Sequence, residues 1–143
     1  MEHDIELIHR FHTTLAARDV DSILAMATED IEVGGARGRG SGAEFLLEWV
    51  RFARISLTPR RWFRDVTFSR EGRHGMPGEF ASTLVVEEDA LWHGATGREM
   101  GRMTFVTVYR VANDKLAGIA RYATLGEAIV SAGLTPDHEV PFR

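Results

Sequence analysis

Apolar and polar residues alternate most regularly in segment 98–124. Over residues 100–111 the chain is rich in Val, Thr, Phe and Tyr, which fit the pleated, half-buried surface of a β-strand. One face of this strand is bulkier and uncharged, so we predict that it points inward; it carries Met103, Phe105, Thr107, Tyr109 and Val111. The other face carries Arg102, Thr104, Val106, Val108 and Arg110. A turn near 113–114 joins this strand to a second one.

Helical spacing of apolar residues predicts four helices, at about 4–17, 19–27, 41–54 and 125–132. Asp19, Ser41 and Thr124 are predicted N-caps, and Gly133 is expected to end the last helix. The third helix carries a stripe of Phe45, Trp49 and Phe52, which should pack on the sheet. Further strands are predicted at 31–33, 61–69 and 79–93, the last with a bulge near 87–89. The glycine-rich stretch 34–42 and residues 70–78 are expected to be loops.

This order places helices apart from a meandering sheet, which indicates an α+β fold. We expect one domain over 1–143, because a chain of this length forms a single core. A curved antiparallel sheet wrapped around the N-terminal helices would give a cone with an internal pocket.

Composition narrows the classes of partner. The net charge of −4 argues against a nucleic-acid or anionic-membrane partner, and no apolar run approaches the ~20 residues of a membrane span. The chain has no cysteine, which removes disulfides and thiol catalysis and fits a reducing compartment. The start Met-Glu-His-Asp lacks the basic residues of a signal peptide, so we expect a cytoplasmic protein. Neither a Walker A loop nor a metal-ligand motif is present, and we predict no cofactor and no metal.

Two segments carry candidate chemistry, each with an ordinary structural reading beside it. His12 flanks the apolar stripe of the first helix, so it is either a hydrogen-bonded residue at the core edge or a general base that reaches a cavity. Arg37 and Arg39 precede a helix N-terminus, which suits an anion, but a solvated surface loop is the better explanation of this stretch.

Residues 16–31 and 115–134 resemble the nuclear transport factor 2-like (NTF2-like) superfamily, in its SnoaL-like, polyketide cyclase-related branch. The resemblance implies a cystatin-like cone, a ligand pocket and often a dimer formed through the outer sheet face. It also implies that Arg121, beside Ile119, points into the cone. The residues that ketosteroid isomerases use correspond here to Phe11, to 34–35 and to a position near Thr107, so their chemistry does not carry over.

The orientation of Arg121 depends on the preceding turn. A three-residue loop at 112–114 places Arg121 on the face of Phe105, whereas a two-residue turn at 113–114 places Tyr122 there, because a slip of one residue reverses every side chain. An inward Arg121 would either bind a ligand anion or pair with a protein group; Asp65 is the strand carboxylate considered for the second role.

We therefore expect a small-molecule-binding protein that takes an apolar or carbonyl-containing ligand. If it is an enzyme, it is an isomerase, cyclase or dehydratase that uses His12 as base and Arg121 or Tyr109 as oxyanion partner. The predicted ligand-binding residues are Phe11, Trp49, Phe105 and Thr107. The alternative is a non-catalytic binding or interaction module of the same fold. A homodimer through the apolar outer face of Thr104, Val106 and Val108 is also expected.

Overall fold

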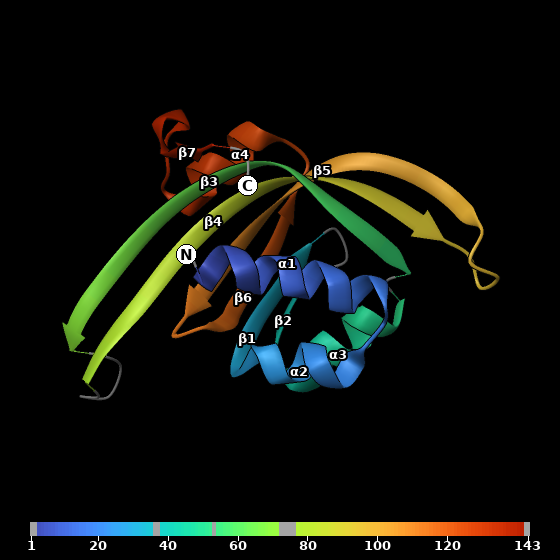
Figure 1. The fold of residues 1–143 in the computed structure, drawn as a ribbon, viewed down its shortest axis with the longest axis horizontal. Coiled ribbons are helices and arrows are strands. Elements are labelled where there is room, and N and C mark those ends of the chain that lie inside the picture. Colours follow the sequence, from blue (N-terminus) through green and yellow to red (C-terminus); the bar gives the residue numbers. More distant parts are fainter. Residues whose placement is uncertain (1–2, 36–37, 53, 72–76, 142–143) are drawn as a thin grey trace.

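An open, seven-stranded mixed sheet forms the frame of the protein (Figure 1). The computed structural model describes residues 3–35, 38–52, 54–71 and 77–141. In these residues the strand order is β2-β1-β6-β5-β4-β3-β7. The strands are β1 Ala27–Gly35, β2 Gly38–Ser41, β3 Ile55–Glu71, β4 Pro77–His93, β5 Glu99–Ala112, β6 Lys115–Tyr122 and β7 Glu139–Val140. Each of the strands β3 to β6 pairs antiparallel with the next, as predicted, and the parallel pair of β1 and β6 makes the whole sheet mixed.

Three helices lie on the concave side of the sheet: α1 His3–Ala16, α2 Val20–Met26 and α3 Ala43–Phe52 (Figure 1). Helix α4, Leu125–Ala132, lies on the convex side and is followed by the short helix η2, Pro136–His138. The α+β class and the curved sheet around N-terminal helices are confirmed. Asp19 and Thr124 cap α2 and α4, and Gly133 ends α4 in the left-handed region, all as predicted. No described helix is both long and apolar enough to cross a membrane.

The glycine-rich stretch differs from the prediction. Residues 38–41 form β2, which pairs with β1 in an antiparallel hairpin, and residues 36–37 lie outside the described part. Ser41 belongs to this strand, so the predicted helix start at Ser41 is wrong. Gly42, with φ of +92°, separates the strand from α3. Gly40 has a steric reason to be glycine, because a Cβ there would lie 2.3 Å from the Phe45 ring.

Helix α4 covers part of the outer sheet face. Val106 and Val108 are each only 3% exposed and pack in a cluster with Phe63, Ala128 and Ile129. Their apolar character is therefore explained within the chain. The argument for a dimer through these two residues is wrong, and a homodimer stays a prediction without that support.

The bulge that was predicted near residues 87–89 of β4 lies instead in the neighbouring strand β3. The register shifts between Pro59 and Arg61 of β3, opposite Glu88 and Glu87 of β4. Strand β3 begins at Ile55, before the predicted start at 61. Pro59 lies at the register shift, a position where a strand tolerates proline, and outside the pair Trp62 and Phe63 to which β7 is joined.

The β5–β6 hairpin orients Arg121. Asn113 and Asp114 form a two-residue turn with positive φ values of 47° and 65°, as in a type I′ turn. That turn alone would have placed Tyr122 inside. Opposite Arg110 and Val111, however, β6 contains a β-bulge with one extra residue. As a result, Arg121 pairs with Thr107 and lies on the same inner face.

Candidate functional site

A buried carboxylate lies at the centre of the concave face. Glu88 of β4 is 0% exposed, and both of its oxygens accept hydrogen bonds. Thr107 Oγ1 donates to Oε1 at 2.5 Å, and Tyr109 Oη donates to Oε2 at 2.6 Å. His12 Nε2 lies 2.5 Å from the same Oε2. An isolated buried carboxylate is costly, and this one is stabilised by three partners from β5 and α1.

His12 reaches this cluster because α1 packs its apolar stripe against the sheet. The preceding residue, Phe11, is 0% exposed, and His12 is only 6% exposed. Its Nε2 also lies 3.2 Å from Tyr109 Oη. Its Nδ1 is buried and has no hydrogen-bond partner among the described residues.

Tyr109 is held as a neutral phenol. The residue is fully buried, and burial raises the pKa of its hydroxyl well above the ordinary value; the negative charge of Glu88 acts in the same direction. Because its single hydrogen goes to Glu88, Tyr109 orients that carboxylate and has no further hydrogen to give to an oxyanion.

Arg121 lies beside this cluster, between two aromatic rings. Its Cζ is 4.5 Å from the ring centroid of Trp49 and 4.5 Å from that of Phe105. Its Nε and Nη2 are buried without a hydrogen-bond partner in the described part of the chain. Burial lowers the pKa of the guanidinium below its ordinary value, although the negative charge of Glu88 acts in the opposite direction. We call Arg121, Trp49 and Phe105 the arginine clamp.

The structure brings all seven predicted site residues together on the concave face. His12, Tyr109, Thr107 and Phe11 form or flank the Glu88 cluster, and Arg121, Trp49 and Phe105 form the clamp. Asp65, considered as a partner of Arg121, is exposed on the opposite face, two residues from Phe63 of the outer cluster. That pairing is wrong.

Glu88 is the site residue that sequence reasoning missed. It shares the period-two face of the buried residues Leu84, Val86 and Ala90, and a carboxylate on such a face is a signal in itself. A bulge was predicted at 87–89, and a bulge interrupts the alternation of inward and outward side chains, so Glu88 was not assigned to the inner face.

The concave face is uncovered at one end. Met103, predicted to point into the core, is 53% exposed although it lies on the same face as Phe105. Trp92, whose ring lies 6.0 Å from that of Phe105, is half-buried. The arginine clamp is therefore next to solvent, whereas Glu88 is fully enclosed. The predicted internal pocket stays a prediction.

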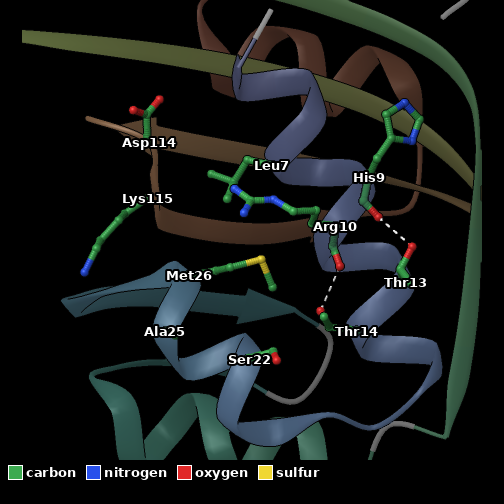
Figure 2. A pocket seen from close by; sticks show the side chains of 10 residues that line it. All are labelled: Leu7, His9, Arg10, Thr13, Thr14, Ser22, Ala25, Met26, Asp114 and Lys115. Carbon is green, nitrogen blue, oxygen red and sulfur yellow. Dashed lines mark hydrogen bonds between the residues drawn. The ribbon is translucent and has the colours of Figure 1, made fainter.

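Two pockets of the described structure lie outside this cluster. The first, of about 600 Å³, is a groove between α1, α2 and the β5–β6 turn (Figure 2). Leu7 and Met26 form its apolar wall, while Arg10 extends into it and Thr13 and Thr14 bond to helix carbonyls. The second, of about 370 Å³, lies on the outer face over β1, β2 and β6. In the described residues no group of His, Asp or Glu side chains is placed to hold a metal ion.

Comparison with solved structures identifies the fold. An NTF2-like protein of unknown function from Burkholderia pseudomallei aligns with a TM-score of 0.61 over 92% of this chain and 98% of that chain, at 16% identity. The chain has the NTF2-like fold. A putative polyketide cyclase from Sinorhizobium meliloti aligns with a TM-score of 0.58 over 85% of this chain and 100% of that chain, at 11% identity. TerC, co-crystallized with polyporic acid, aligns with a TM-score of 0.57 over 92% and 98%, at 17% identity.

These similarities concern structure alone. No protein-family model matches the sequence, and no curated protein matches it significantly. At such low identity the NTF2-like fold says nothing of the reaction, so function has to be argued from the residues of the site.

Proposed function

We propose that this NTF2-like protein binds a small, planar carbonyl compound with a negative or developing negative charge, and performs acid–base chemistry on it. The observation that carries the proposal is the arginine clamp. An unpaired buried donor costs about 1–3 kcal/mol, and Arg121 holds two of them. A carboxylate or enolate oxygen outside the chain would satisfy both.

The clamp also favours a flat ligand. The ring centroids of Trp49 and Phe105 each lie 4.5 Å from the guanidinium Cζ, and Trp92 lies close to Phe105 at the open end of the face. A ring entering beside Met103 would contact these aromatic surfaces, and its acidic oxygen would meet the Nε and Nη2 edge of Arg121.

His12 supplies the base in this proposal. Its imidazole would take a proton from the carbon next to the carbonyl group. The electron pair of that C–H bond would form the enolate, whose oxygen faces Arg121. Return of the proton from His12 to another carbon would complete an isomerisation with no net loss of atoms or charge. Without proton transfer, the same site is that of a non-catalytic binding module.

Binding can be tested by calorimetry with benzoate, its neutral analogue benzamide, and polyporic acid. We expect benzoate to bind more tightly than benzamide, and Arg121→Met to weaken benzoate about tenfold or more, the loss of one charge-assisted hydrogen bond. Arg10→Met is the matched control, because Arg10 lies in the separate groove of Figure 2. If Arg10→Met weakens binding and Arg121→Met does not, the anion site is the groove.

Catalysis is tested separately with phenylpyruvate in D₂O. We expect the protein to speed deuterium exchange at the carbon next to the ketone, and His12→Gln to abolish the acceleration. Exchange at the rate of buffer alone, with benzoate bound normally, would leave only the binding function.

Two wider expectations belong to this proposal. A homodimer is supported only by the resemblance to NTF2-like proteins, and light scattering measures it. A cytoplasmic location is supported by composition, through the absence of cysteine.

A further inference from the structure

Glu88 is too enclosed to meet a ligand, yet it organises every polar group around it. It is 0% exposed; its oxygens accept hydrogen bonds from Thr107 and Tyr109, and its Oε2 also lies 2.5 Å from His12 Nε2. These three partners come from β5 and α1, which are far apart in sequence. The carboxylate of Glu88 is therefore held in place, and it fixes the position of the His12 imidazole.

Counting hydrogens assigns the protonated nitrogen of His12. The Tyr109 hydroxyl has one hydrogen and donates it to Glu88 Oε2 at 2.6 Å, so it cannot also donate to His12. A carboxylate only accepts. The hydrogen in the 2.5 Å contact between His12 and Glu88 must therefore lie on Nε2. Nδ1 is buried and has no acceptor among the described residues, so a hydrogen on Nδ1 would be left unpaired.

We infer that Glu88 is a positioning residue that holds His12 in the Nε2–H tautomer and leaves Nδ1 as the proton acceptor of the site. The catalytic part of this inference rests on the proposed function, whereas the tautomer is a property of the free protein. A buried carboxylate that orients an imidazole in this way is the relation found between Asp and His in hydrolase triads. Here Thr107 and Tyr109 hold the carboxylate in turn.

Arg121 completes the arrangement. It is the cross-strand neighbour of Thr107, which bonds directly to Glu88, so cation, carboxylate and imidazole follow one another across β6, β5, β4 and α1. A proton taken up at Nδ1 would give the imidazole of His12 a positive charge. The negative charge of Glu88, in contact with the far side of the imidazole, would balance it.

The tautomer can be read by nuclear magnetic resonance of protein labelled with ¹⁵N-histidine, without ligand at neutral pH. The chain has six histidines, and His12→Gln identifies the signal of His12 by its loss. We expect the wild-type spectrum to show the hydrogen on Nε2 and a bare Nδ1. A hydrogen on Nδ1 of His12 in the wild-type protein would overturn the inference.

Glu88→Gln tests the positioning role, with Tyr109→Phe as control. Glu88→Gln should mix the two tautomers and slow deuterium exchange of phenylpyruvate at least about tenfold, with benzoate affinity nearly unchanged. Tyr109→Phe keeps the contact between His12 and Glu88, so the tautomer should stay as in the wild type. An unchanged tautomer in Glu88→Gln would contradict the inference. Absence of benzoate binding with the tautomer as expected would overturn only the proposed function.

Discussion

Replacing Arg121 with Met should leave the free energy of unfolding within about 1 kcal/mol of wild type. The described structure holds no carboxylate paired with this guanidinium, so the change strands no partner. It removes two unpaired buried N–H groups, which cost about 1–3 kcal/mol each. Against this, it removes two cation–π contacts worth about 0.5–2 kcal/mol each. The methionine thioether packs well between aromatic rings, so the opposing terms nearly cancel.

Arg64→Met is the matched comparison. Arg64 Nε lies 2.7 Å from Asp4 Oδ2, in a pair whose side chains are 27% and 7% exposed. Losing Arg64 leaves the carboxylate of Asp4 buried without its cation, and breaking a buried pair costs about 3–5 kcal/mol. We expect about 2–3 kcal/mol here, because the exposed part of Arg64 lets water screen the interaction.

Both variants are measured by urea unfolding of the ligand-free protein, followed by tryptophan fluorescence. We expect a clear shift of the urea midpoint for Arg64→Met and almost none for Arg121→Met. If Arg121→Met loses as much stability as Arg64→Met, Arg121 has a protein partner and acts as scaffold. The anion role would then be withdrawn.

Three further changes test the packing and the electrostatics. Val106→Arg should cost about 3 kcal/mol or more or prevent folding, because it buries an unpaired charge under α4; chemical unfolding measures the loss, and light scattering should show no change in oligomeric state of whatever folds. Gly40→Ala should cost about 1–3 kcal/mol, since its Cβ would lie 2.3 Å from the Phe45 ring, whereas Gly101→Ala meets nothing within 4 Å and should stay within about 0.5 kcal/mol of wild type in the same assay. The raised pKa of Tyr109 means that the folded state holds this proton more tightly than the unfolded state, so stability should fall as pH rises above about 10, and Tyr109→Phe should flatten that decline in unfolding curves.

Each of these has a clear contrary result. A folded Val106→Arg protein of wild-type stability would show that α4 does not cover the outer face. Equal stabilities of the two alanine variants would contradict the close approach of β2 and α3. An alkaline stability profile that Tyr109→Phe leaves unchanged would place the responsible group elsewhere.

Local pattern was enough to determine most of the elements and the α+β class. Alternation in 100–111 predicted β5 and the inward face of Phe105, Thr107 and Tyr109. It could do so because successive side chains of a β-strand point to opposite faces of the sheet. Asp19 and Thr124 predicted helix starts because a cap is a contact between near neighbours in the chain.

Only the tertiary structure decided what fills the centre of the site. The alternation that predicted β5 could not place Arg121, since one bulged residue in β6 reverses every side chain after it. Glu88 was overlooked because the register shift expected in β4 lies in β3 instead.

The cover of the outer face was likewise decided by packing at long range. Val106 and Val108 have the apolar character of an interface, and the sequence alone does not tell whether a second chain or a later segment of the same chain buries them. Helix α4 does so here. The contact of His12 with Glu88 joins residues 76 positions apart, and no local pattern encodes that distance. It exists because the sheet curves around α1 and brings the two side chains to the same point.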